Sequence, residues 1–226
     1  MKHVSFIFFL FTALNIYSQG HDDVVKIGYN LNNQQSMGIT PVYEYIVQGS
    51  PYLNKIFKMG KVILNGKTET ESLMRYNIYR DHFELLDNTG KQVYLEKNSK
   101  IDIVLDGKTY QYIDYLYRGK VKFGYCTPLN HGKTILFIRD IKKVSEYKRP
   151  AHGYESFSPP KFIDEFVYYI KRENKPAKEV ELNKRDVPFV IENKFTELRN
   201  YIKKNKLKLK TEEEVITLLQ YYDSLE

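Results

Sequence analysis

The sequence has a single cysteine, Cys126, and no tryptophan. One cysteine cannot form a disulfide within the chain, so a fold held together by internal disulfides is excluded. Beyond the first residues there is also no apolar run near the 20 residues that a membrane-spanning helix needs. We therefore expect at most peripheral contact between the folded chain and a membrane.

The sequence also lacks the second glycine of a phosphate-binding loop in its three Gly-Lys-Thr segments, which begin at Gly66, Gly107 and Gly132. That glycine stands five residues earlier and lets the backbone curl around phosphates. These positions hold Lys61, Asp102 and Thr127 instead. Hairpin turns explain the three segments, and we do not expect nucleotide binding.

No catalytic or metal-binding pattern is complete. Cys126 and His131 would be a thiolate and its base in a nucleophilic enzyme, but a lone cysteine on a strand more often packs as a small hydrophobic side chain. Histidines at helical i, i+4 or at tight strand spacing, as metal sites use, do not occur. Paired carboxylates for glycoside hydrolysis could come from Asp102, Asp106 and Asp114, or from Asp164 and Glu165, but the polar face of a strand accounts for them. We expect no metal and no cofactor.

The first 18 residues have the layout of a secretory signal peptide. Lys2 and His3 form a short basic start, an apolar core follows from Val4 to Leu14, and a short polar region ends in the small residue Ser18. The apolar core is shorter than a membrane span. The sequence therefore predicts export, with cleavage near Ser18.

The segment from Met74 to Glu96 predicts three antiparallel strands. Apolar and polar residues alternate from Met74 to Tyr79, and the alternation resumes at Phe83 after a short interruption. Residues 87–90, Asp-Asn-Thr-Gly, are typical of a tight turn. Short connections favour antiparallel pairing, because parallel strands need a crossover of a dozen residues or more.

Further strands are expected on both sides of this segment. Asn65-Gly66 favours a type I′ hairpin turn. The alternation changes phase near Tyr112, which predicts a β-bulge or a break in the strand there, and the apolar run from Ile135 to Ile138 predicts a strand covered on both faces. The proline-containing stretch from Ser145 to Pro160 is the longest expected loop, a kind of segment that often carries function.

The last 44 residues have helical periodicity. Asp186 before Val187-Pro188 is typical of a helix start, and Thr211 with Glu214 forms a capping box for a second helix. We expect two short helices packed as a hairpin. The predicted organisation is a signal peptide (1–18), a polar lead-in (19–45), an antiparallel β domain (46–182) and a helical subdomain (183–226).

The formal net charge is +7, and tyrosine is abundant, with 20 residues. Because lysine and arginine are spread along the chain, we expect a solvated basic surface. The predicted export argues against a nucleic-acid partner. The densest basic run is a candidate contact with an anionic surface and contains Lys203, Lys204, Lys206 and Lys208. The candidate binding surface consists of five tyrosines and a histidine: Tyr76, Tyr79, His82, Tyr112, Tyr115 and Tyr154.

Several blocks of the sequence resemble segments of a known family, and they occur in the same order. GSPYLN (49–54), GKVILNGK (60–67), LMRYNIYRDHFEL (73–85) and YIKKNKLKLKTEEEVITLLQYYDSL (201–225) are similar to segments of a family of uncharacterised exported proteins of Bacteroidetes-type Gram-negative bacteria. The resemblance implies a periplasmic or surface location. It implies no catalytic residues.

The sequence thus predicts an exported α+β protein, mostly an antiparallel curled sheet or sandwich closed by a C-terminal helical hairpin. The leading hypothesis is a non-catalytic binding or interaction module of the cell envelope, whose partner is an envelope protein or a polysaccharide. One alternative is an envelope hydrolase with a site assembled from loops. The other is an accessory protein at the outer membrane that uses the lysine run.

Overall fold

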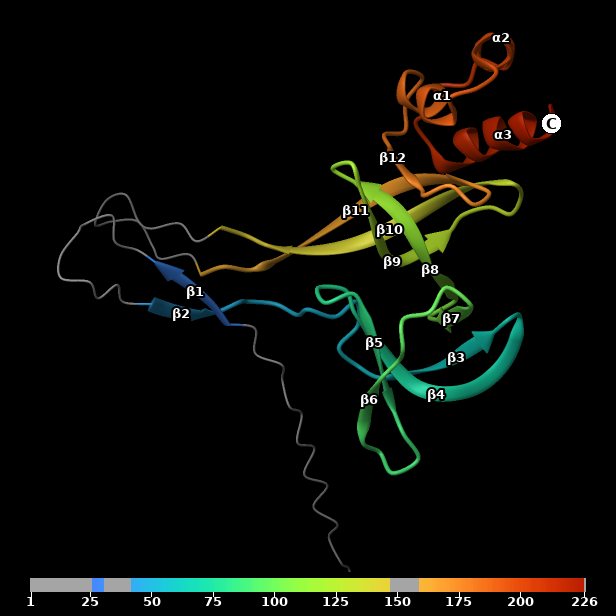
Figure 1. Ribbon diagram of the computed structural model, residues 1–226. Coiled ribbons are helices and arrows are strands. Elements are labelled where there is room, and N and C mark those ends of the chain that lie inside the picture. Colours follow the sequence, from blue (N-terminus) through green and yellow to red (C-terminus); the bar gives the residue numbers. More distant parts are fainter. Residues whose placement is uncertain (1–25, 31–41, 147–158, 226) are drawn as a thin grey trace, which may run out of the picture.

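The computed structural model describes residues 26–30, 42–146 and 159–225. Its main feature is a ten-stranded sheet in the order β12-β11-β10-β9-β8-β7-β3-β4-β5-β6, with antiparallel pairing along its strands (Figure 1). Strands β1 and β2 form a separate antiparallel pair. Three helices follow at the C-terminal end. The expected α+β class is confirmed.

The elements have the following bounds. The strands are β1 (Lys26–Asn30), β2 (Val42–Ile46), β3 (Lys58–Leu64), β4 (Lys67–Asn77), β5 (His82–Leu86), β6 (Gln92–Tyr94), β7 (Ile101–Leu105), β8 (Lys108–Tyr117), β9 (Lys120–Pro128), β10 (Thr134–Val144), β11 (Phe162–Arg172) and β12 (Lys178–Val180). The helices are α1 (Asp186–Ile191), α2 (Phe195–Lys204) and α3 (Glu212–Asp223).

The meander that the sequence predicts around residues 74–96 is present as β4, β5 and β6. Tyr76 pairs with Phe83 across β4 and β5, and Leu85 pairs with Val93 across β5 and β6. At the β3–β4 turn Asn65 and Gly66 both have positive φ, 51° and 78°. Positive φ at both central residues is what a type I′ turn requires, so the expected hairpin is confirmed.

Two of the three hydrophobic cores lie on opposite faces of strands β8 and β9, and we call them the lower and the upper core; the third lies between the sheet and the helices. Tyr110 of β8 lies in the lower core together with Tyr76, Phe83 and other side chains of β3–β5. Ile113, three residues further along β8, lies in the upper core formed by β8–β11. Odd spacing along a strand changes the face on which a side chain lies.

The prediction of a β-bulge or a break near Tyr112 is wrong. β8 pairs with β9 in one unbroken register from Gln111 to Tyr117, and the register shift of the sheet lies instead between Val62 and Ile63 of β3. The apolar residues change parity because β8 buries one face in the lower core and then the other face in the upper core. A strand that buries first one face and then the other therefore shows the same change of apolar parity in its sequence as a strand with a β-bulge.

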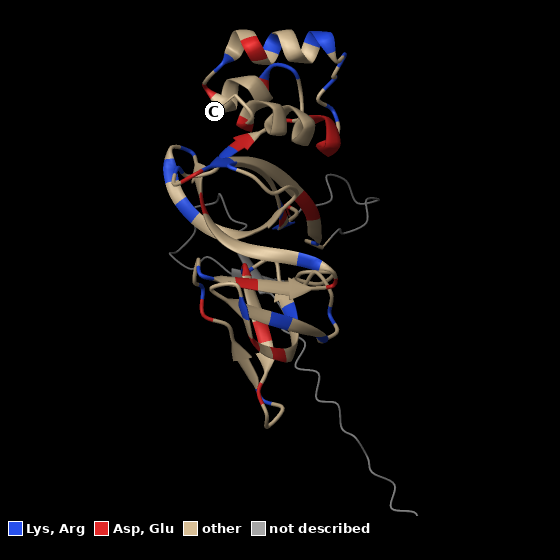
Figure 2. Ribbon diagram, turned by 90° about the vertical axis from the view of Figure 1, so that its right-hand side faces the viewer, with Lys and Arg blue, Asp and Glu red and all other residues tan. Residues whose placement is uncertain are grey.

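Strands β8 to β11 curl into a nearly closed ring, and Figure 2 looks into its opening. The ring closes at Ala177, which forms a parallel bridge with Tyr115 of β8. The Ala177 N–H donates to the Asp114 carbonyl (2.9 Å), and the Ala177 carbonyl accepts from the Leu116 N–H (2.8 Å). The expectation of a curled sheet is confirmed by this closure.

The helices cover the outside of this ring on β10–β12, at the top of Figure 1. Leu136 of β10 packs among helical residues such as Leu198 and Leu219, whereas its neighbour Phe137 lies in the upper core. The apolar run of β10 is therefore covered on both faces, as expected. No helix of the described ranges is long and apolar enough to cross a membrane.

The helical region has three helices where the sequence predicts two. Glu192 and Lys194 adopt left-handed backbone with φ of 62° and 55°, and they end α1 before α2 begins. Neither residue is glycine, so the break has no strong sequence signal. The capping box of α3 is present, because the Thr211 hydroxyl accepts from the Glu214 N–H (3.3 Å).

Two expectations fall on parts of the chain outside the described ranges. These are the signal peptide, residues 1–18, and the centre of the proline-containing loop, residues 147–158.

Candidate functional site

The tyrosines and the histidine expected to form a binding surface do not gather on one surface. Tyr76 and Tyr115 are only 2% and 5% exposed. They fill the lower and upper cores respectively, so neither can contact a partner. For these two residues the expectation is corrected, because inward-facing tyrosines here supply core volume.

The other members of that set lie nearer to solvent. Tyr79 is 39% exposed and packs edge-on against Phe162, with ring centroids 5.3 Å apart. Tyr112 and His82 are half-buried. Tyr154 lies outside the described ranges. Among the described members of the predicted surface, Tyr79, Tyr112 and His82 have accessible side chains.

Buried polar contacts at the junction of the two cores explain the position of Tyr76. Asp81 lies in the β4–β5 turn with φ of 54°. Its Oδ1 accepts from the Tyr76 hydroxyl (2.6 Å) and its Oδ2 lies 3.4 Å from Nη2 of Arg139 on β10. Burial, followed by the charge and hydrogen bond of Asp81, raises the pKa of Tyr76 well above its usual value. Asp81 therefore joins the two halves of the sheet.

The thiol of Cys126 cannot serve as a nucleophile paired with His131. Cys126 is 1% exposed on β9, whereas His131 is exposed in the turn that follows. Burial raises the pKa of the Cys126 thiol to about 12. Since the thiolate is the reactive form, Cys126 acts as a packed side chain of the upper core.

The carboxylates considered for glycoside hydrolysis do not converge. Four of them form separate ion pairs and the fifth contacts an amide: Asp106 with Lys58 (2.8 Å), Asp114 with Lys171 (2.6 Å), Asp164 with Lys142 (2.5 Å), Glu165 with Lys143, and Asp102 with Gln111 (3.4 Å). Paired acid and base carboxylates must face one scissile bond. These five do not provide that arrangement.

The third Gly-Lys-Thr segment does bind a carboxylate, but one from the same chain. Asp223 Oδ2 at the end of α3 accepts from the N–H groups of Lys133 (3.0 Å) and Thr134 (3.1 Å). This contact fastens α3 to the β9–β10 turn.

The best-organised polar cluster surrounds Glu84 on the outer face of β4 and β5, opposite the lower core. Glu84 has no exposed surface. Its Oε2 accepts from Arg75 Nε (2.6 Å), and its Oε1 lies 3.1 Å from His82 Nε2 and 3.3 Å from the Tyr52 hydroxyl. A buried carboxylate requires such partners, because an unpaired buried charge is strongly destabilising. We call Tyr52, Arg75, His82 and Glu84 the Glu84 network.

The Arg75 guanidinium lies between two aromatic rings. Its central carbon is 3.8 Å from the ring centroid of Tyr52 and 4.5 Å from that of Phe57. Arginine favours such stacking because its guanidinium is planar and weakly hydrated. The contacts hold the segment from Tyr52 to Phe57 over the sheet, and they make this part of the outer face rigid.

The network joins two separate sequence blocks, 49–54 and 73–85. Arg75 and Glu84 stand directly opposite each other in the β4–β5 register. Their opposite charges on either side of an expected hairpin are the one signal by which the sequence could have revealed this pair. Nothing in the sequence places Tyr52 against them.

Large apolar side chains surround the Glu84 network and remain exposed. Met59 of β3 pairs with Leu73 of β4 on the same outer face as Arg75, and the two are 62% and 41% exposed. Tyr94 of β6 pairs with Glu84, is 61% exposed, and contacts the His82 ring edge-on at 4.7 Å. Ile56, beside Phe57, is 71% exposed. We call Ile56, Met59, Leu73 and Tyr94 the apolar rim.

The lysine run lies on a different part of the molecule. Lys203 and Lys204 end α2, and Lys206 and Lys208 follow in the connection to α3; all four are exposed. Cations at the end of a helix interact favourably with its dipole, and solvent access leaves them able to contact an anionic surface.

Comparison with known proteins gives no further identification. No family model, no curated protein and no solved structure matches the chain.

Proposed function

We propose that the chain is an exported, non-catalytic binding or protein-interaction module of the bacterial cell envelope, and that it binds through the Glu84 network and its apolar rim. The observation that carries this proposal is the exposure of Met59, Leu73 and Tyr94 beside an ion pair whose carboxylate, Glu84, is fully buried. Clustered large apolar side chains on a surface are typical of interaction sites.

The rigidity of this surface favours binding. A partner that docks on preorganised side chains loses less conformational freedom than one that must order them. Arg75 is 12% exposed and stacked on both sides, so its position changes little when a partner arrives. Aliphatic Ile56, Met59 and Leu73 suit a protein partner better than a polysaccharide, which would favour aromatic platforms.

Location in the envelope rests on the amino-acid sequence. The layout of residues 1–18 and the resemblance of several sequence blocks to exported proteins both support export. The hydrolase alternative is less well supported, since Cys126 is buried and the acidic side chains considered for it are engaged separately.

The test is crosslinking in cells with a C-terminally tagged copy, followed by mass spectrometry of the proteins that co-purify. We expect a recurrent envelope protein, lost when Met59→Ser and Leu73→Ser are combined. Val121→Ser is the matched control, because Val121 is 52% exposed on a strand outside this surface. A partner that survives the double substitution, or no recurrent partner, would refute the proposal.

A second candidate is an accessory protein at the outer membrane. The exposed run that contains Lys203, Lys204, Lys206 and Lys208 favours it, because an anionic lipid surface attracts clustered cations in a salt-dependent manner. Release of the protein from washed membranes by salt alone would support this candidate, and retention in high salt or absence from membranes would oppose it.

A further inference from the structure

A groove of about 420 Å³ lies between helices α1 and α2, at the end of the molecule opposite the Glu84 network (Figure 1). Each helix contributes one arginine and one phenylalanine to its lining. Arg185 and Phe189 come from the start and the body of α1, and Phe195 and Arg199 come from α2. In both helices the two residues are four positions apart, so they lie one turn from each other on the same face.

The two phenylalanine rings are exposed. Phe189 is 71% exposed and Phe195 is 41% exposed, and neither ring contacts another aromatic ring within the described ranges. The helices pack on the sheet through other side chains, such as Ile191 and Leu198. The two rings are therefore not needed for the core, and large apolar side chains grouped on a surface are typical of binding sites.

The groove has an excess of positive charge. Lys184, Arg185 and Arg199 are exposed and form no ion pair with any described residue. Asp186 is the one carboxylate among the lining residues, and its Oδ2 accepts from Asn183 Nδ2 (3.2 Å). An anionic ligand is therefore favoured in the groove.

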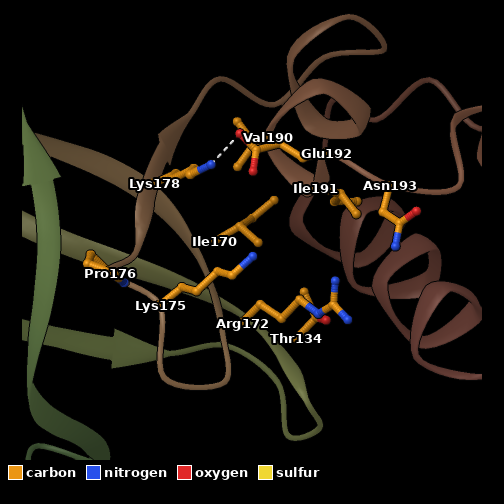
Figure 3. A pocket seen from close by; sticks show the side chains of 10 residues that line it. All are labelled: Thr134, Ile170, Arg172, Lys175, Pro176, Lys178, Val190, Ile191, Glu192 and Asn193. Atoms are coloured by element: carbon orange, nitrogen blue, oxygen red, sulfur yellow. Dashed lines mark ion pairs between the residues drawn. The ribbon is translucent and has the colours of Figure 1, made fainter. Parts of the chain in front are cut away.

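Carboxylates that are close in sequence face other parts of the molecule. Glu192 forms an ion pair with Lys178 of β12 in the neighbouring cavity (Figure 3). Glu197 stands midway between the two groove residues of α2, so at about 3.6 residues per turn it points to the other side of that helix. Glu181 is not part of the lining. These groups leave the positive charge of the groove in place.

The basic surface continues from the groove along α2. Phe195, Arg199 and Lys203 follow one another at intervals of four residues, so they share one face of the helix. Lys203 and the adjacent Lys204 are exposed. An extended chain of anionic units can contact the groove and the end of α2 at the same time, which a single small anion cannot do.

We propose that the groove and the adjoining face of α2 bind an acidic polysaccharide. The apolar faces of its sugar rings stack on Phe189 and Phe195. Its carboxylates contact Arg185 and Arg199, because a planar guanidinium can bind both oxygens of a carboxylate. The choice of a polysaccharide rests on the proposed export, whereas the site is separate from the Glu84 network and the apolar rim.

Amide chemical shifts of the purified chain, measured by NMR at low ionic strength, test the proposal. The probe is a hexamer of galacturonic acid. Maltohexaose has the sugar rings without the charge, and hexaglutamate has the charge without the sugar rings. We expect saturable shifts at Phe189, Phe195 and Arg199 with hexagalacturonate, and at least severalfold weaker binding of the other two compounds.

Absence of saturable shifts at these amides would overturn the site. Equal binding of hexaglutamate would show a surface for acidic peptides, and equal binding of maltohexaose a surface for neutral sugars; either result would overturn the proposed ligand. None of these results affects crosslinking from the apolar rim, so this proposal and the outer-face proposal fail separately.

Two substitutions of exposed side chains separate the rings from the charges. Phe189→Ser is expected to weaken hexagalacturonate binding severalfold, and Phe123→Ser, which removes a 55% exposed ring from β9, is its matched control. Arg199→Gln is expected to weaken binding about tenfold, as for a charge-assisted hydrogen bond. Its control is Arg118→Gln, in the turn after β8. Equal effects of either substitution and its control would show non-specific contact and overturn the site.

Discussion

Tyr125 and Cys126 are consecutive residues of β9, yet their side chains fill different hydrophobic cores, Tyr125 the lower and Cys126 the upper. Both are 1% exposed. The strand therefore acts as a shared wall, and residues on its two faces are equally protected from solvent.

This position predicts the reactivity of the thiol. Because burial raises the pKa of Cys126 from 9.0 to about 12, the group stays protonated at pH 8 in the folded chain. We expect iodoacetamide to modify Cys126 slowly at pH 8 and quickly once denaturant unfolds the protein. Cys126 is the only cysteine, so the mass of the labelled chain reports on it directly. Labelling of the folded chain at the rate of a free thiol would contradict the two-core arrangement.

Glu84→Gln is expected to destabilise the fold by about 3 kcal/mol, because it leaves the Arg75 charge without its buried partner. The measurement is the free energy of unfolding in urea. Glu71→Gln on the neighbouring strand β4 is the matched control: Glu71 pairs with Lys61 at 2.8 Å, but both side chains are about half exposed. An exposed pair contributes less than about 1 kcal/mol. Equal effects of the two substitutions would mean that the Glu84 network is not buried in solution.

The buried tyrosines predict a loss of stability at alkaline pH. Burial raises the pKa of Tyr76, Tyr110, Tyr125 and Tyr169 above the usual 10.0, and burial with the Glu212 contact raises that of Tyr168 to about 12. The unfolded chain thus loses these protons first as the pH rises. Stability is fully present below pH 10 and falls above it, by about 1.4 kcal/mol per pH unit for each such group.

Unfolding in urea at pH 8, 10 and 11, combined with tyrosinate absorbance, measures this effect. We expect the urea concentration at the midpoint of unfolding to be lower at pH 11 than at pH 10. We also expect some of the tyrosines to ionise only when the protein unfolds. If all tyrosines ionised near pH 10 while the sheet stayed folded, the burial of these side chains would be refuted.

Gly60→Ala is expected to destabilise the protein by about 2 kcal/mol, the cost of overpacking a core. A Cβ at Gly60 would lie 2.5 Å from Met74 Sδ and 2.8 Å from the Val104 carbonyl oxygen. The backbone atom cannot move aside as a flexible side chain can. Lys61→Ala, at the next and exposed position of β3, serves as control. Thermal unfolding should show a lower Tm for Gly60→Ala alone, and an unchanged Tm would refute the close approach of β3 and β7.

The sequence predicts the strands well where one face is buried and the other is solvated. The register of Tyr76 with Phe83 follows from a simple alternation and a short turn. The prediction fails at Tyr112, where β8 changes the face that it buries, because alternation reports only whether a side chain is covered. It also fails at Glu192 and Lys194, which adopt left-handed conformations although neither is a glycine.

The candidate sites were less predictable than the fold. Arg75 and Glu84 could have been paired from the hairpin alone, but Tyr52 reaches them only because its segment pairs with Asn77 at the end of β4. Such convergence depends on the curl of the sheet, which local periodicity does not encode.

The most direct test of the outer-face proposal is site-specific photocrosslinking in the cells that express the protein. A photoreactive amino acid replaces Met59 in one strain and Phe189, 71% exposed on α1, in another. The proposal predicts a discrete crosslink to one envelope protein from position 59 and none of that kind from position 189. No crosslink from position 59, or the same pattern from both positions, would contradict it.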